Sequence, residues 1–141
     1  MAVLDMAGHL IRRLHQQSTQ LFALRTQAAG FDLTPVQYAA LEAIHENPGM
    51  DQARLAELIA YDRATIGGVI ERLEKKGWVR RVVSEKDRRA RELSLSTKGN
   101  KVLVALQPIV QDLQNDILQP LNGADRACFI KLAQQLVLQS T

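Results

Sequence analysis

Apolar side chains recur every three or four residues along most of the chain, the spacing that places them on one face of an α-helix. This period runs through residues 2–29, 34–45, 51–59, 62–76, 96–117 and 125–139. Residues 78–83 break it with β-branched side chains, and residues 92–95 alternate polar with apolar positions. Both patterns are typical of β-strands. The chain is therefore expected to be mainly α-helical with one small β-hairpin.

Capping residues sharpen the helix boundaries. Thr34 precedes Pro35, which suits the first position of a helix, and Gln37 stands where a capping box needs it. Gly30 is placed to close the helix before it, because glycine accepts the left-handed conformation that follows a helix C-terminus. The starts of three later helices carry N-cap residues: Asp51, Asp62 and Ser96.

The two helices at 51–59 and 62–76 indicate a helix-turn-helix, with residues 60–61 as the tight turn between them. A hairpin follows this pair at once. A helix-turn-helix continued by a hairpin is the outline of a winged helix, which is far more specific than either half. The length fits one domain over residues 1–141, with the winged lobe at 34–95.

On the helix at 62–76, the helical period separates a core side from an outward side. The core side is expected to hold Ile66, Val69, Ile70 and Leu73. The outward side is expected to hold Ala64, Gly68, Glu71, Arg72 and Lys75, with Gly67 beside them. The short helix before it is expected to bury Ala53, Leu55, Ala56, Leu58 and Ile59, and the last helix Phe129, Ile130, Leu132, Ala133, Leu136 and Val137.

Positive charge is concentrated in the centre of the chain. Residues 54–91 hold eleven of the eighteen Lys and Arg but six of the fifteen Asp and Glu, so this stretch carries +5 and the rest −2. Phosphate is the obvious counter-charge, which favours a nucleic acid as partner. A solvated charged surface is the alternative.

Two adjacent glycines in the second helix of the pair need a reason, since each costs about 1 kcal/mol relative to alanine. A missing side chain lets the helix lie close to the major groove of DNA. Close packing on another helix is the alternative. Arg63 and Thr65 near the helix start suit base-edge or phosphate bonds, and Arg72 a phosphate farther along.

The hairpin loop gathers cations at its tip, where arginine can enter a narrow minor groove. Asp87 lies among them and is expected to hold a neighbouring guanidinium in place. The predicted DNA-binding residues are Arg54, Asp62, Arg63, Ala64, Thr65, Gly67, Gly68, Arg72, Lys86, Asp87, Arg88, Arg89 and Arg91.

Other functional classes find little support in the sequence. No apolar stretch is long enough to span a bilayer and the first residues do not resemble a signal peptide, so a cytoplasmic protein without membrane contact is expected. The single cysteine excludes an intrachain disulfide. The three histidines lack partners for a metal site, and no phosphate loop, catalytic triad or paired carboxylates suggest an enzyme. No cofactor is expected.

Four segments of the chain form a specific combination: LAELIAYDRAT at 55–65, LEKKGWVRR at 73–81, the Asp87-x-Arg89 pair and LSTKG at 95–99. In these segments most strongly, the chain resembles the MarR family of bacterial regulators. The resemblance implies that the helix at 62–76 reads the major groove, that Arg89 enters the minor groove, and that residues 2–30 and 97–141 form dimerisation helices. It also implies a homodimer on a pseudo-palindromic operator, usually as a repressor. Long apolar stripes in both end segments independently favour a dimer.

Members of this family are commonly released from DNA by small aromatic acids or phenols, and GHLIRR at 8–13 resembles members linked to aromatic-acid catabolism. His9 and Arg13 share a helix face and could hold a carboxylate, and Tyr38 is a further ligand-binding candidate. A redox switch at Cys128 is an alternative, although its apolar neighbours predict a buried, inert thiol. The second alternative is a constitutive DNA-binding protein without an effector.

Overall fold

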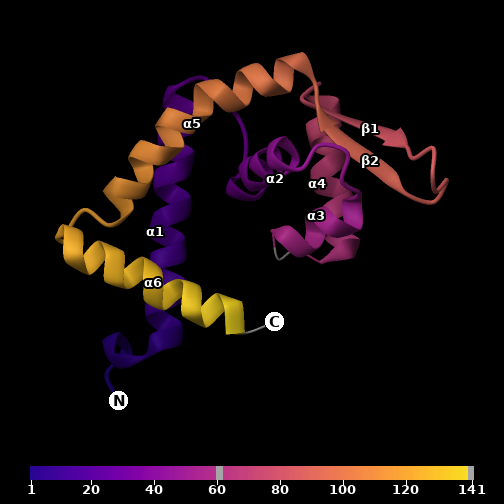
Figure 1. Ribbon diagram of the computed structural model, residues 1–141. Coiled ribbons are helices and arrows are strands. Elements are labelled where there is room, and N and C mark those ends of the chain that lie inside the picture. Colours follow the sequence, from indigo (N-terminus) through magenta and orange to yellow (C-terminus); the bar gives the residue numbers. More distant parts are fainter. Residues whose placement is uncertain (60–61, 140–141) are drawn as a thin grey trace.

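The computed structural model describes residues 1–59 and 62–139 (Figure 1). A short 3-10 helix at Val3–Asp5 precedes α1 (Ala7–Ala28), α2 (Pro35–Glu46), α3 (Gln52–Leu58) and α4 (Arg63–Lys75). Strands β1 (Val79–Val83) and β2 (Arg91–Leu95) follow, and then α5 (Thr97–Ile117) and α6 (Gly123–Gln139). The predicted mainly helical fold with one hairpin is confirmed. The tight turn predicted at 60–61 lies outside the described residues.

Local hydrogen bonds explain where the helices begin and end. The backbone N–H of Gln37 donates to the Thr34 hydroxyl, and the backbone N–H of Thr34 donates to the Gln37 side chain, both at 3.2 Å. Gly30 and Gly77 follow α1 and α4 with φ of 85° and 77°. At Gly77 the next N–H, of Trp78, reaches back to the Leu73 carbonyl at 3.0 Å, which satisfies the end of α4. The predicted caps at Asp51, Asp62 and Ser96 are also present.

The hydrophobic core lies where α2, α3 and α4 meet the hairpin, and it continues along α5 to Leu113 and to Phe22 of α1. All four predicted core residues of α4 are buried, none more than 4% exposed: Ile66, Val69, Ile70 and Leu73. They pack with Leu41 of α2, Leu55 of α3 and Leu93 of β2 in one cluster. The face that α4 turns away from this cluster is therefore the face left for a partner.

The hairpin is antiparallel and is joined by a third segment of backbone. Val79 pairs with Leu95 at its base and Val83 with Arg91 near its tip. The Leu93 N–H donates to the Met50 carbonyl and the Gly49 N–H to the Leu93 carbonyl, both at 2.8 Å. The chain just before α3 is thus hydrogen-bonded to β2, so the hairpin is attached to both helices of the pair.

The first turn of α5 approaches the end of α4 closely. A Cβ added to Gly99 would lie 2.0 Å from the Trp78 carbonyl oxygen, which no real side chain can do. The Ser96 hydroxyl donates to the Gly77 carbonyl at 2.5 Å and accepts the Gly99 N–H at 2.9 Å. Glycine at position 99 therefore permits the chain to turn from the hairpin into α5.

The last helix corrects one prediction. Helix α6 has no buried residue in the single chain: Phe129 and Ala133 are half-buried, whereas Ile130, Leu132, Leu136 and Val137 are exposed. Leu58 of α3 is also exposed rather than buried. The reason is that a groove separates α6 from α1, so α6 turns most of its surface to solvent. Cys128 of α6 is likewise exposed, so the predicted burial of its thiol is wrong for the single chain.

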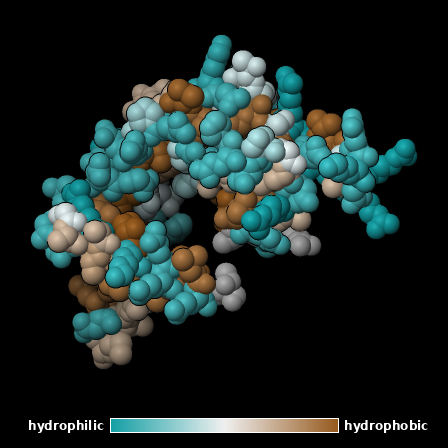
Figure 2. All heavy atoms as spheres, viewed as in Figure 1, coloured by the Kyte–Doolittle hydropathy of each residue, from teal (hydrophilic) through white to brown (hydrophobic). Residues whose placement is uncertain are grey.

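An apolar groove of about 530 Å³ separates α6 from α1. Its lining comes from α1, the end of α5 and α6, with Ile11, Leu14, Phe129 and Leu136 among the apolar side chains. In Figure 2 hydrophobic atoms gather over these helices, at the lower left of the view. Arg126 ties α6 to the end of α5 by donating to the Leu118 and Leu121 carbonyls at 3.1 and 2.9 Å. Within the described ranges, no helix is long and apolar enough to cross a membrane.

Candidate nucleic-acid interface

The start of α4 is fixed by an acidic cap. Asp62 accepts the backbone N–H of Thr65 at 2.9 Å and the Thr65 hydroxyl at 2.7 Å. These bonds, the side-chain bond from Thr65 first, hold the pKa of Asp62 below its ordinary value, so the carboxylate stays ionised. Both residues are exposed, and the Thr65 oxygen can still accept a hydrogen bond. The predicted Arg63 side chain lies outside the part of the chain that the structure describes.

The outward face of α4 is small in its first half and basic in its second. Ala64, Arg72 and Lys75 are exposed. A Cβ added to Gly68 would meet only the Arg72 guanidinium, at 3.8 Å, and one added to Gly67 only the Gln52 amide nitrogen, at 3.4 Å. Both distances are ordinary van der Waals contacts with flexible side chains. Packing against another helix therefore does not require either glycine, and the sequence alternative of close helix packing loses its support.

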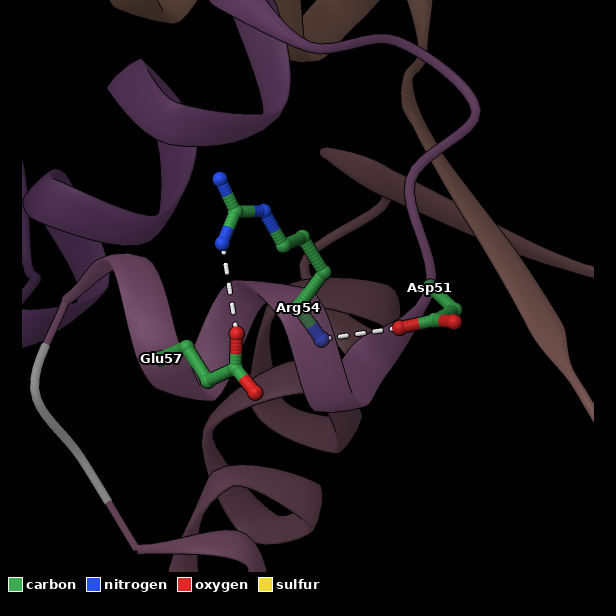
Figure 3. A network of polar contacts seen from close by, with 3 residues as sticks. All are labelled: Asp51, Arg54 and Glu57. Atoms are coloured by element: carbon green, nitrogen blue, oxygen red, sulfur yellow. Dashed lines mark hydrogen bonds and ion pairs between the residues drawn. The ribbon is translucent and has the colours of Figure 1, made fainter.

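Arg54 stands on the exposed side of α3 (Figure 3). Its backbone N–H donates to the Asp51 carboxylate at 2.8 Å, which caps the helix. Its guanidinium lies 3.2 Å from the Glu57 carboxylate, one turn farther along the same helix. This ion pair is exposed, so it is weak and leaves Arg54 available to a stronger anion such as phosphate.

The tip of the hairpin is shaped by side chains that bond its own backbone. Ser84 is buried, and its hydroxyl accepts the N–H groups of Lys86 and Asp87 at 3.2 and 3.3 Å. Asp87 accepts the backbone N–H of Arg89 at 3.0 Å. Its carboxylate thus helps to fold the loop through the backbone. The consequence is that Arg89 projects from an ordered turn with its side chain exposed. That Asp87 also holds a neighbouring guanidinium stays a prediction.

The other predicted cations of the tip are exposed as well. Lys86, Arg88 and Arg91 all face solvent. Arg91 donates to the Arg88 carbonyl at 3.0 Å, so its guanidinium lies along the loop rather than away from it. The loop between β1 and β2 extends away from the helices (Figure 1), and its exposed cations therefore form a cluster at the tip of the hairpin.

Sequence reasoning missed Arg81, which joins the hairpin to both helices. Its guanidinium donates to the Gln52 side-chain oxygen of α3 at 3.1 Å and pairs with the Glu74 carboxylate of α4 at 3.1 Å. The signal was present in the strand alternation, since Arg81 shares a face with buried Val79. A shallow groove of about 480 Å³ runs from this cluster to the loop, lined by Asp51, Gln52, Ala53, Arg81, Asp87, Arg89, Ala90 and Arg91.

The three predicted ligand residues are not brought together within one chain. His9 is half-buried and Arg13 exposed, both at the start of α1. Tyr38 of α2 instead lies beside Phe22, with ring centroids 6.2 Å apart. Thirteen residues of helix separate Phe22 from His9, which is about 20 Å along the axis. His9 and Arg13 therefore lie together at the start of α1, whereas Tyr38 lies near the other end of that helix.

Tyr38 belongs to a polar cluster between α2 and α5. Its hydroxyl donates to the Glu42 carboxylate, which also accepts from the Gln107 amide at 3.3 Å. Burial, and then the bond to this carboxylate, raise the pKa of Tyr38 well above its ordinary value. The phenol therefore remains a hydrogen-bond donor at any physiological pH. In the residues described, no group of three His, Cys, Asp or Glu could hold a metal ion.

Comparisons with known proteins agree with this geometry. A model of the MarR family matches residues 31–90. The transcriptional regulator HosA of Escherichia coli O111:H- is 34% identical over 137 residues, covering 97% of this chain and 98% of HosA. The crystal structure of the PcaV transcriptional regulator of Streptomyces coelicolor, in complex with its natural ligand, superposes with a TM-score of 0.92 at 29% identity. That match covers 100% of this chain and 98% of PcaV.

A further similar structure links DNA binding to a small molecule. It concerns the regulation of DNA binding of Bordetella bronchiseptica BpsR by 6-hydroxynicotinic acid, with a TM-score of 0.88 and 25% identity. The match covers 94% of each chain. The similar proteins are thus regulators of transcription, and they share both the winged lobe and the helices that flank it.

Proposed function

The chain belongs to the MarR family of DNA-binding transcriptional regulators, and we propose that two copies bind a pseudo-palindromic operator as a repressor that a small aromatic acid or phenol releases. The observation that carries this proposal is the pairing of a glycine-faced helix with an arginine-tipped hairpin on one lobe. The helix α4 suits the major groove, and the hairpin suits the adjacent minor groove.

Each part of the interface has a separate role in this proposal. Residues 62–68 at the start of α4 enter the major groove, where Thr65 and Arg63 contact bases or phosphates and the glycines allow the helix to lie close. Arg54 and Arg72 bind flanking phosphates. Arg89 enters the minor groove from the turn that Asp87 and Ser84 fold, and the neighbouring loop cations bind the backbone.

The exposed apolar surfaces of α1 and α6 support a homodimer. Ile11 of α1 is 60% exposed, and Leu136 and Val137 of α6 are 70% and 63% exposed. A second copy related by a two-fold axis would cover these side chains. Because the symmetry of the protein is mirrored in its DNA, the half-sites are expected about one helical turn apart.

The effector part of the proposal rests on chemistry and on the similar proteins. PcaV has a natural ligand and BpsR is regulated by 6-hydroxynicotinic acid, an aromatic acid. In this chain His9 and Arg13 can offer two donors to a carboxylate. Tyr38 can donate to a phenol or carboxylate only if its bond to Glu42 is exchanged.

Footprinting on the DNA upstream of the chain's own gene, with and without millimolar aromatic acids, tests this function. We expect a protected inverted repeat that disappears when the effector is added. If no inverted repeat were protected, the proposal that the protein binds an operator would be overturned. Protection that no aromatic acid or phenol alters would leave a constitutive DNA-binding protein. Release by peroxide, abolished in Cys128→Ser, would favour the redox alternative, which the exposed thiol supports.

A further inference from the structure

We propose that Arg81 is a positioning residue for DNA binding: it fixes the angle between the hairpin and α4 and so decides whether Arg89 reaches the minor groove. This inference rests on the proposed role of the hairpin. Arg81 itself lies between the hairpin and the helices, with its side chain 28% exposed and its guanidinium bonded to Gln52 and Glu74.

The geometry of β1 gives Arg81 this role. Side chains two residues apart on a strand share a face, so Val79, Arg81 and Val83 all point toward the helices. Val79 is buried at the base of the hairpin, whereas Val83 is 48% exposed. Apolar packing therefore ends after the first residue of β1. Beyond it, the Arg81 guanidinium connects β1 to α3 and α4 through its two bonds.

These two bonds connect three elements at once. The guanidinium reaches Gln52 at the first position of α3 and Glu74 near the end of α4, both at 3.1 Å. The Gln52 amide in turn lies over Gly67 of α4, where an added Cβ would be 3.4 Å away. A planar guanidinium held at two points has a fixed orientation, so tilting the hairpin breaks one bond or the other.

The neighbouring hairpin attachment does not fix this angle alone. The strand β2 is hydrogen-bonded to the backbone at 49–51, which anchors one edge of the hairpin. A two-stranded ribbon held along one edge can still rotate about that edge. Arg81 holds the other strand, and the groove that it lines continues to Arg89.

A double-mutant cycle between Arg81 and Arg89 tests the inference, with affinity measured on a labelled duplex that the wild-type protein selects from a random library. We expect Arg81→Met and Arg89→Ala each to weaken binding on the order of tenfold. The double variant should be no weaker than the worse single variant, because a misdirected hairpin gains nothing from its arginine.

Arg80 provides the matched control. It lies next to Arg81 on the same strand, pairs with Ser94 and faces solvent on the opposite side. Arg80→Met removes the same charge, but its effect should multiply with that of Arg89→Ala. If the losses of affinity multiplied both for Arg81→Met with Arg89→Ala and for Arg80→Met with Arg89→Ala, the positioning role of Arg81 would be overturned. The contact of the hairpin with DNA would still stand. If Arg89→Ala alone has no effect, the hairpin contact and the inference both fail.

Glu74→Ala tests the same bond from the other side and does not depend on how well Arg81→Met folds. Removing an acidic residue near DNA ordinarily strengthens binding, because repulsion by the phosphates is lost. The inference expects the reverse, about fivefold weaker binding, since the guanidinium loses its anchor on α4. Glu71→Ala, at an exposed position of α4, should bind as well as wild type or better. Tighter binding by both variants would refute the inference.

Discussion

Replacing Gly68 by alanine should make the protein more stable and its DNA binding weaker. Glycine inside a helix costs about 1 kcal/mol relative to alanine. The added methyl group would meet only the Arg72 guanidinium, at 3.8 Å, so nothing in the fold opposes it. For a chain of this size, 1 kcal/mol corresponds to a rise of roughly 2–4 °C in the melting temperature.

The same methyl group would stand between α4 and the floor of the major groove. Forcing an extra carbon into a close-packed interface costs about 1–3 kcal/mol, which is about 5- to 150-fold in affinity. Differential scanning calorimetry measures the first effect. Fluorescence anisotropy with a labelled operator duplex, at fixed salt concentration, measures the second. The two quantities are expected to move in opposite directions.

Gly8→Ala is the matched control for this prediction. Gly8 lies in α1, and a Cβ added there meets nothing within 4 Å. Because α1 is a proposed dimerisation helix, the affinity of this variant is compared at protein concentrations where size-exclusion chromatography shows it to be as dimeric as wild type, and it should then be unchanged. If Gly68→Ala bound the operator as tightly as wild type, the close approach of α4 to DNA would be refuted. A lower melting temperature would refute the argument that packing does not need the glycine.

Three further outcomes are expected. Arg89→Ala should weaken operator binding about tenfold without changing the melting temperature, since its exposed side chain supports no contact of the core; equal affinity in a gel shift would count against the hairpin contact. Gly99→Ala should cost at least about 2 kcal/mol in urea unfolding, because its Cβ would collide with the Trp78 carbonyl; a smaller loss would show that α5 can shift. Asp62→Asn should make stability less dependent on pH. The Thr65 bonds lower the folded-state pKa of Asp62, so its contribution is present above its ordinary value of 3.8 and is lost as the pH falls below it. An unchanged profile of melting temperature between neutral pH and pH 2 would contradict this assignment.

Much of the fold could be predicted from the sequence, because helix caps and helical periodicity depend on residues close together in the chain. The capping box at Thr34, the caps at Asp51 and Asp62 and the turn at Gly30 all depend on bonds within a few residues, so their partners are fixed by spacing alone. The core side of α4 was predictable for a similar reason, because a helix of known period has only one apolar face. The basic centre and the resemblance to a family then located the candidate interface.

Contacts between elements were decided only by the tertiary structure. That the Asp87 carboxylate accepts the backbone N–H of Arg89 could not be predicted from the sequence, because the fold of the loop decides it. The sequence does not distinguish Arg81 from the other surface cations. Only the packing of the hairpin on the helices brings its guanidinium to Gln52 and Glu74. The apolar residues of α6 have a clear helical pattern, yet a pattern shows which side chains need cover and not what covers them. In the single chain most of that apolar face is exposed to solvent. The helical period shows that these side chains favour burial, but only the tertiary structure shows which surface packs against them.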